Sequence, residues 1–184
     1  MDASRETYAV EIAGLKRELP LFQVAPGLRI AVLNILGDTE LVQACAGALS
    51  GKLSGMSYDI LVTAEAKSIP LVHAMSVMVN KPYVVLRKFY KPYMGVALSA
   101  ETLSITTGKP QMLYLDEKDY ETIRDRRVVL LDDVISTGST LHGMRLVVDK
   151  AGADVVAEAG IFTEGDREKS KDIIALGHLP VFKG

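Results

Sequence analysis

The stretch that most constrains the fold of this chain covers residues 128–140 and reads VVLLDDVISTGST. Its first four residues are apolar, which predicts a strand buried on both faces. Two adjacent carboxylates, Asp132 and Asp133, follow where we expect that strand to end. A short run of Ser, Thr and Gly comes next, and from Leu141 onward apolar residues recur at helical spacing. A strand, a small-residue loop and a helix in this order place backbone N–H groups at a helix N-terminus, where an anionic group binds well.

This strand, acidic pair and loop resemble the motif with which type I phosphoribosyltransferases bind 5-phosphoribosyl 1-pyrophosphate (PRPP). The resemblance implies that Asp132 and Asp133 form the catalytic pair, face the ribose hydroxyls and hold Mg²⁺ through water. It also implies that the loop cradles the 5′-phosphate of PRPP, with Ser136, Thr137, Gly138, Ser139 and Thr140. The alternative is a solvated strand end followed by an ordinary capped helix, because Asp, Ser and Thr also favour such places. Two other phosphate-binding patterns, G-x-x-x-x-G-K-[ST] and G-x-G-x-x-G, do not occur in the sequence.

A second strand, loop and helix precede this motif. Residues 59–63 predict a strand and residues 69–79 predict a helix. Pro70 is compatible with this helix because proline is tolerated in a first turn. The loop between them is similar to the family's Glu-Ala-Arg-Gly loop, which often carries a non-proline cis peptide. The resemblance implies a pyrophosphate site at Glu65, Ala66, Lys67 and Ser68, where Ser68 replaces the usual Gly. The alternative for Lys67 is a merely solvated loop lysine.

Basic residues follow the next predicted strand, residues 83–86. A basic pair at the carboxyl end of a strand suits a substrate with several phosphate charges. By resemblance the pyrophosphate site also takes in Arg87, Lys88 and Lys91. The alternative is a basic strand end that only discourages edge pairing. Tyr90 and Tyr93 either make contacts in a homodimer, which the resemblance implies, or lie over the base.

The N-terminal part of the chain predicts a strand at residues 8–12, a turn-rich segment at 19–27 and a mostly apolar segment at 28–36. The resemblance implies that residues 1–37 form a hood over the base. It further implies that the base meets Ile30, Ala31 and Val134. The family usually has Phe-Arg-Asp where this chain has Ile30-Ala31-Val32, which leaves the identity of the base open.

A hairpin is predicted from strands at residues 102–106 and 112–115, joined by a turn at Gly108-Lys109-Pro110. The resemblance implies that residues 95–116 form a flap over the site. Adenine-type enzymes have Leu-Glu-Tyr-Gly in this flap, with a Glu that assists proton transfer. This chain has Ile105-Thr106-Thr107-Gly108 and no carboxylate there.

The remaining sequence predicts a helix over residues 39–53 with Asp38 as its N-cap. Gly152 is expected to end the helix that begins after the phosphate loop. A strand is expected at residues 155–162 and a charged surface turn at 163–172. Residues 179–182 predict a short final strand or a strap on the hood.

Composition excludes several classes of protein. A net charge of −2 predicts no broad face for nucleic acid, and the single cysteine, Cys45, excludes an internal disulfide and a cysteine-rich zinc site. Cys45 falls in the apolar pattern of a predicted helix, so we expect a buried, inert thiol. No apolar run is long enough to span a bilayer and the first residues lack an apolar leader, so we expect a cytoplasmic protein that does not bind membranes.

These patterns predict an α/β fold with a doubly wound, mostly parallel sheet. We expect one domain over residues 1–184, with a hood at 1–37, a core at 38–184 and a flap at 95–116. The resemblance implies an enzyme that uses PRPP and Mg²⁺ to transfer the phosphoribosyl group to a purine base. Adenine is the expected base, giving AMP and pyrophosphate. The alternatives are a 6-oxopurine phosphoribosyltransferase and a non-catalytic PRPP- or nucleotide-sensing protein on the same fold.

Overall fold

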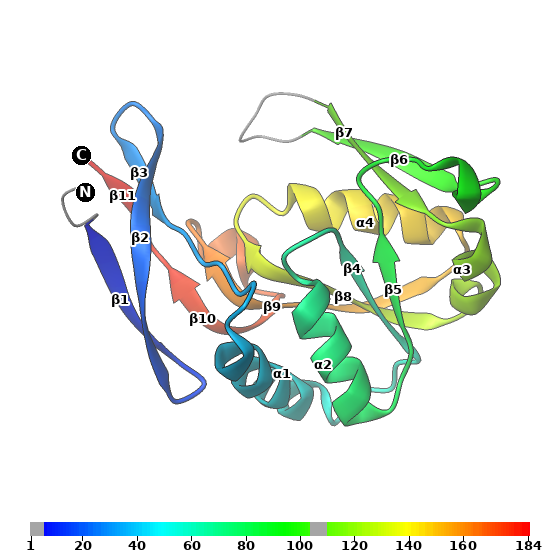
Figure 1. Ribbon diagram of the computed structural model, residues 1–184, viewed down its shortest axis with the longest axis horizontal. Helices are drawn as coiled ribbons and strands as arrows, with labels where there is room; N and C mark the ends of the chain where they lie inside the picture. Colours follow the sequence, from blue (N-terminus) through cyan, green and yellow to red (C-terminus); the bar gives the residue numbers. More distant parts are fainter. Residues whose placement is uncertain (1–5, 104–109) are drawn as a thin grey trace.

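The computed structural model describes residues 6–103 and 110–184, and a five-stranded parallel sheet forms its centre (Figure 1). The strand order is β10 (Ile174–Leu179), β9 (Asp154–Glu164), β8 (Arg127–Ile135), β4 (Ile60–Ala64) and β5 (Tyr83–Leu86). Every neighbouring pair in this sheet is parallel. The predicted α/β class with a parallel sheet is therefore confirmed.

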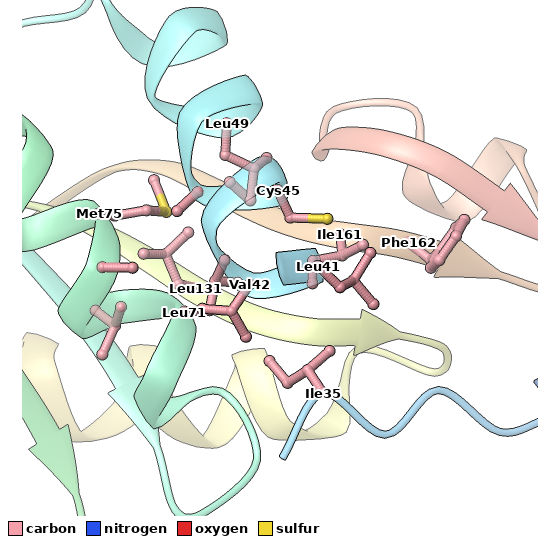
Figure 2. Packing of buried hydrophobic residues seen from close by; sticks show 14 of the residues in the cluster. Ile35, Leu41, Val42, Cys45, Leu49, Leu71, Met75, Leu131, Ile161 and Phe162 are labelled. Atoms are coloured by element: carbon pink, nitrogen blue, oxygen red, sulfur yellow. The ribbon is translucent and has the colours of Figure 1, made fainter. Parts of the chain in front are cut away.

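Helices cover both faces of the central sheet. On one face lie α1 (Thr39–Leu53) and α2 (Ile69–Val79), and on the other lie α4 (Ser139–Lys150) and α3 (Glu117–Ile123). Strand β8 contributes side chains to both faces of the sheet. Leu131 packs in the core with α1 and α2 (Figure 2), as does Val129, whereas Val128 and Leu130 pack in the core with α4. All four side chains are fully buried, which explains the continuous apolar run in the sequence.

Strand β8 continues past the point where we expected it to end. Asp132 still pairs with Gly160 of β9, and the pairing with β9 reaches Ile135. On its other side β8 pairs with β4 only as far as Leu131. The acidic pair therefore lies inside the strand, on a segment that has one neighbouring strand and an open edge. We expected β8 to end before Asp132, and this was wrong. The strand continues because its partner β9 also extends beyond its own apolar residues, as far as Glu164.

The hood is a separate antiparallel sheet in the order β1 (Thr7–Ile12), β2 (Leu15–Ala25), β3 (Leu28–Ala31) and β11 (Val181–Lys183). Strand β11 confirms the predicted strap, since it joins the end of the chain to β3. The turn-rich segment predicted at residues 19–27 is instead mostly strand β2. Pro20 has no N–H to donate, but its carbonyl accepts a hydrogen bond from the N–H of Val32, at 2.9 Å, so it keeps one bond of the hood sheet.

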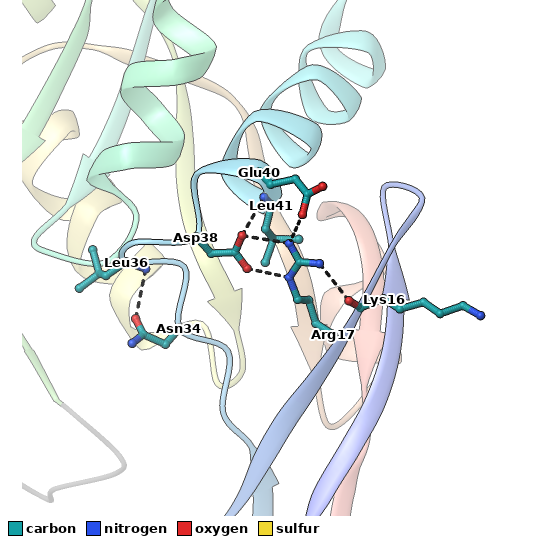
Figure 3. A network of polar contacts seen from close by, with 7 residues as sticks. All are labelled: Lys16, Arg17, Asn34, Leu36, Asp38, Glu40 and Leu41. Carbon is teal, nitrogen blue, oxygen red and sulfur yellow. Dashed lines mark hydrogen bonds and ion pairs between the residues drawn. The ribbon is translucent and has the colours of Figure 1, made fainter.

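An ion-pair network ties the hood to the central sheet's first helix (Figure 3). Arg17 of β2 contacts both carboxylate oxygens of Asp38, at 2.7 and 3.0 Å, and Glu40 at 2.8 Å. The Asp38 carboxylate also accepts a hydrogen bond from the N–H of Leu41, at 3.1 Å, which confirms the predicted N-cap of α1. The hydrogen bond from Arg17 is the main reason that the pKa of Asp38 lies below its usual value.

The flap consists of β6 (Leu98–Leu103) and β7 (Pro110–Leu115), which pair antiparallel and pack against α4. The described residues do not include Ile105–Gly108, where the sequence departs from the family, or Lys109. Thr163 and Glu164, expected in a surface turn, are instead the buried end of β9. Strand β10 and helix α3 were not anticipated, and two short 3₁₀ turns occur at Pro92–Met94 and Glu168–Ser170.

One expectation about the interior is met. Cys45 is fully buried in α1, and this burial raises the pKa of its thiol to about 11, as expected for an inert residue. Among the residues that the structure describes, no helix is both long enough and apolar enough to cross a membrane.

Candidate functional site

A cavity of about 470 Å³ opens at the carboxyl ends of β4 and β8. Ligands of open α/β sheets bind at this edge. The cavity is lined by Glu65, Ala66, Lys67, Ser68, Lys88, Gln111 and residues 132–141. The structure thus brings the predicted pyrophosphate loop to the acidic pair and the predicted phosphate loop, although more than 60 residues separate Ser68 from Asp132 in sequence.

The predicted phosphate loop wraps the N-terminus of α4. Gly138 has a φ of +76°, a left-handed conformation that glycine adopts without strain, and it is the N-cap of the helix. The helix begins at Ser139, one residue before the predicted loop ends. The hydroxyls of Thr137 and Ser139 lie 3.2 Å apart at this end. Backbone N–H groups, hydroxyls and the positive end of the helix dipole together suit an anionic group.

The acidic pair is in direct contact with the predicted pyrophosphate loop. Ser68 Oγ lies 2.8 Å from Asp132 Oδ1, and Lys67 Nζ lies 3.0 Å from Asp133 Oδ2. Asp133 is 5% exposed, so Lys67 neutralises a buried carboxylate. Burial, and next the charge of the neighbouring Asp133, raise the pKa of Asp132. The protein therefore keeps two carboxylates side by side at a cost in free energy, which is typical of a functional site.

Glu65, which we predicted to bind pyrophosphate, makes contacts with the end of the neighbouring strand. Its carboxylate forms an ion pair with Arg87 and accepts a hydrogen bond from the N–H of Lys88, at 2.8 Å. The peptide bond between Glu65 and Ala66 is cis, as the resemblance implied. Glu65 therefore joins the end of β4 to the end of β5 and is engaged by protein groups.

The predicted pyrophosphate residues are only partly brought together. Lys67, Ser68 and Lys88 line the cavity, whereas Arg87 lines two neighbouring cavities of about 260 and 430 Å³. Lys91 lies outside the lining of all three, at the N-cap of the 3₁₀ turn that begins at Pro92.

The predicted base residues are also divided. Val134 lines the cavity, but Ile30 and Ala31 pair inside the hood sheet, with Ala31 buried in the core. The hood reaches the site through Leu33 instead, whose carbonyl accepts a hydrogen bond from Lys67 Nζ at 3.3 Å.

Sequence reasoning missed two residues at this edge. Gln111 of the flap strand β7 lines the cavity. Glu164, at the end of β9, is 5% exposed, and burial raises the pKa of its carboxyl while a hydrogen bond with Ser136 opposes that rise. The signal used for Asp132 was a carboxylate at the end of an apolar strand. Glu164 shows a similar signal, because it lies two residues after the predicted strand at 155–162.

The donor set fits a magnesium ion that is shared with a ligand. Among residues 6–103 and 110–184, no group of three or more His, Cys, Asp or Glu side chains is placed to hold a metal alone. Mg²⁺ usually takes one or two carboxylates and completes its shell with water and substrate phosphates. Asp132 and Asp133, both in the cavity lining, supply such a pair of carboxylates.

Comparison with known proteins identifies similar sequences. The chain is 28% identical over 165 residues to the adenine phosphoribosyltransferase of Thermosipho africanus, covering 87% of this chain and 94% of that protein. It is 26% identical over 144 residues to the purine biosynthesis transcriptional repressor PurR of Bacillus subtilis, covering 78% and 50%. It is 33% identical over 123 residues to the hypoxanthine/guanine phosphoribosyltransferase of Methanococcus vannielii, covering 67% and 61%. The match thus spans less than two thirds of the last two relatives.

Solved structures support the same fold. The adenine phosphoribosyltransferase of Thermoanaerobacter pseudethanolicus superposes with a TM-score of 0.66 at 20% identity, covering 94% of this chain and 95% of that one. The adenine phosphoribosyl transferase of Trypanosoma brucei, in complex with AMP, pyrophosphate and ribose-5-phosphate, gives the same TM-score and identity over 94% of this chain and 76% of that one. The family model of the phosphoribosyl transferase domain matches residues 32–179, well over half of the chain. The chain therefore belongs to the phosphoribosyl transferase family.

Proposed function

We propose that this protein is an enzyme that transfers the 5-phosphoribosyl group from PRPP to a purine base, with adenine as the base. The observation that carries the proposal is the convergence of three sites in one cavity: a helix N-terminus, a carboxylate pair and a lysine-bearing loop. PRPP has a 5′-phosphate, ribose hydroxyls and a pyrophosphate, and each needs one of these sites. A relative that is aligned over 87% of this chain and 94% of its own length is an adenine phosphoribosyltransferase, which supports the choice of base.

The roles that we propose follow the positions of the side chains. Residues 136–140 bind the 5′-phosphate, and Asp132 and Asp133 accept hydrogen bonds from the ribose 2′ and 3′ hydroxyls. Lys67 and Lys88, with the backbone of residues 65–68, bind the pyrophosphate. Arg87 and Lys91 stay a prediction for this group, and Ile30, Ala31 and Val134 for the base.

The transfer replaces one bond at C1 of the ribose with another. The bond from C1 to the pyrophosphate oxygen breaks, the bond from C1 to the base nitrogen forms, and the proton that the base nitrogen loses passes to an oxygen of the leaving pyrophosphate. Positive charge develops on the ribose while negative charge grows on the leaving pyrophosphate. Lys67 and Lys88 stabilise that negative charge, and the two loops hold the reacting atoms in line. Bound Mg²⁺, held by Asp132 and Asp133, would neutralise part of the pyrophosphate charge.

The choice of base follows from the apolar hood. The hood has no charged side chain at Ile30, Ala31 or Val32, which suits a 6-amino purine that donates to a main-chain carbonyl. Because Ile30 and Ala31 pair inside the hood sheet, that carbonyl would come from a neighbouring residue. A 6-oxopurine needs a donor near its O6, and Lys109 of the flap turn is the candidate that would supply one. The similarity to a hypoxanthine/guanine phosphoribosyltransferase supports 6-oxopurines as the alternative class of base. An assay of nucleotide formation from PRPP and Mg²⁺ with adenine, hypoxanthine, guanine and xanthine decides between them, and a preference for hypoxanthine that Lys109→Ala abolishes would refute adenine.

A second candidate function is PRPP or nucleotide sensing without transfer. The similarity to a purine biosynthesis transcriptional repressor favours it, as does the missing carboxylate at Ile105–Gly108. The same four-base assay separates the two functions. A protein that binds PRPP but forms no nucleotide with any of the four bases is a sensor.

We also propose that the protein acts as one functional unit over residues 1–184 and as a homodimer. Large apolar side chains are exposed in the segment after β5: Phe89 and Tyr93 are each 71% exposed and Val96 is 82% exposed. A cluster of this kind suits a protein interface. Sedimentation of the purified protein tests this proposal.

A further inference from the structure

Ser68 is the N-cap residue of α2, but its hydroxyl does not cap the helix. A serine in this position usually accepts a hydrogen bond from a backbone N–H in the first turn of its own helix. Here the residue is 1% exposed and its hydroxyl reaches across to strand β8. The serine therefore forgoes a local stabilising contact in favour of one at the cavity.

The hydroxyl makes two good contacts with the acidic pair. It donates to Asp132 Oδ1 at 2.8 Å and accepts from the backbone N–H of Asp133 at 2.9 Å. Its distance to Asp133 Oδ1 is longer, at 3.4 Å. Because a hydroxyl has one proton to donate, the shorter contact to Asp132 takes it. Both hydrogen-bonding capacities are thus used to join the loop to the pair.

These contacts restrict the orientation of one carboxylate. Asp132 Oδ1 also lies 2.9 Å from the N–H of Asp133, so the Ser68 hydroxyl and this N–H hold the same oxygen. A glycine or alanine in place of Ser68 would keep the loop but leave the Asp133 N–H as the one of these two contacts that still holds the carboxylate.

We infer that Ser68 is a positioning residue: its hydroxyl orients the Asp132 carboxylate for the ribose hydroxyls of the ligand and does not itself serve the pyrophosphate. This inference rests on the proposed function, because it takes PRPP as the ligand. It leaves the predicted contact of Ser68 with pyrophosphate to the backbone of that residue. The functional consequence is that a residue on the pyrophosphate loop controls the ribose half of the site.

Three ligands separate the two roles of the loop. PRPP carries both ribose and pyrophosphate, ribose 5-phosphate carries only the ribose half, and inorganic pyrophosphate carries only the other. If Ser68 positions Asp132, loss of its hydroxyl weakens PRPP and ribose 5-phosphate by roughly tenfold each and leaves pyrophosphate unchanged, as for loss of a hydrogen bond to a charged group. Lys67→Ala should weaken PRPP and pyrophosphate more than ribose 5-phosphate, which it affects only through the ion pair of Lys67 with Asp133.

The test is calorimetric titration of the full chain with the three ligands in the presence of Mg²⁺. The variants are Ser68→Ala, Ser68→Gly and Lys67→Ala. Ser76→Ala is the matched control, because it removes another serine hydroxyl from α2, one that donates to the carbonyl of Lys81 at 2.6 Å away from the cavity. The melting temperature of each ligand-free variant reports on folding.

Parallel losses of PRPP and ribose 5-phosphate in both Ser68 variants support the inference. Loss of pyrophosphate binding with ribose 5-phosphate retained would assign the hydroxyl to pyrophosphate and overturn it. Unchanged affinities, or equal losses of all three ligands that follow a lower melting temperature, would also overturn it. A wild-type protein that binds none of the three would refute the proposed function itself, whereas wild-type binding with unresponsive Ser68 variants refutes the inference alone.

Discussion

Asp38 makes two contacts that can be tested separately: an ion pair with Arg17 of the hood and a cap on the N-terminus of α1. The variant Asp38→Asn separates them. Asparagine is as good an N-cap as aspartate, so the variant keeps an acceptor for the N–H of Leu41. It removes the charge that faces Arg17, whose guanidinium contacts both Asp38 oxygens at 2.7 and 3.0 Å. Asp38→Ala removes the cap and the charge together. Comparison of wild type with Asp38→Asn therefore isolates the ion pair, and comparison of the two variants isolates the cap.

The expected loss follows from the exposure of the pair. Both side chains are about one quarter exposed, at 26% and 28%, so the pair is partly shielded from water. A geometry with two hydrogen bonds is worth more than the 0–1 kcal/mol of a fully exposed pair, and we expect about 1–2 kcal/mol for Asp38→Asn. Loss of the cap adds about 1 kcal/mol in Asp38→Ala. For a chain of this length 1 kcal/mol corresponds to roughly 2–4 °C in melting temperature.

The pH dependence gives the sharper test. Because Arg17 lowers the pKa of Asp38 in the folded protein, the pair stabilises the fold above the unfolded-state pKa. That stabilisation is lost as the pH falls through the lower, folded-state pKa. The gap in stability between wild type and Asp38→Asn should therefore be full at pH 6–7 and shrink below about pH 4. Urea unfolding across this range measures it, and a gap that is absent at pH 7 or constant to pH 3 would refute the reasoning.

Three further predictions concern the site and the surface. Lys67→Ala should weaken PRPP by about ten- to a hundredfold and AMP much less in equilibrium titrations, since AMP lacks the pyrophosphate; equal losses would mean that Lys67 acts through general charge. Gly160→Ala should lower the melting temperature, because an added Cβ would lie 2.7 Å from the Ile135 side chain and 3.0 Å from the carbonyl oxygen of Asp132; a melting temperature equal to that of wild type would show that β8 yields freely. Phe89→Asp should convert a dimer to a monomer in sedimentation while Val77→Asp, at a 69% exposed position on α2, should not; a dimer in both would place the interface elsewhere.

The sequence predicted local features well where local chemistry decides them. The bounds of α1 and α2 follow from a capping aspartate and a first-turn proline, and the structure reproduces both ranges. The phosphate loop was recognisable because its small residues, acidic pair and apolar strand are contiguous. The cis peptide at Glu65 came from resemblance to a family and not from any pattern of residues.

Features that depend on distant partners could not be read from the sequence. The extension of β8 past Asp132 depends on the length of β9, and the burial of Glu164 depends on the same strand pairing. Pro20 looked like a turn residue, although it lies in a hood strand whose neighbours determine its conformation. The pairing of Glu65 with Arg87 joins two strands and has no signal in either segment alone.

The central claim is that PRPP binds in the cavity around the acidic pair. Calorimetric titration of PRPP with Mg²⁺ into the wild-type protein and into the Asp132→Asn/Asp133→Asn double variant tests it most directly. We expect one PRPP per chain for wild type, and a double variant that folds but binds PRPP at least about a hundredfold more weakly, because two charge-assisted contacts are lost. A folded double variant with the affinity of wild type would contradict the claim.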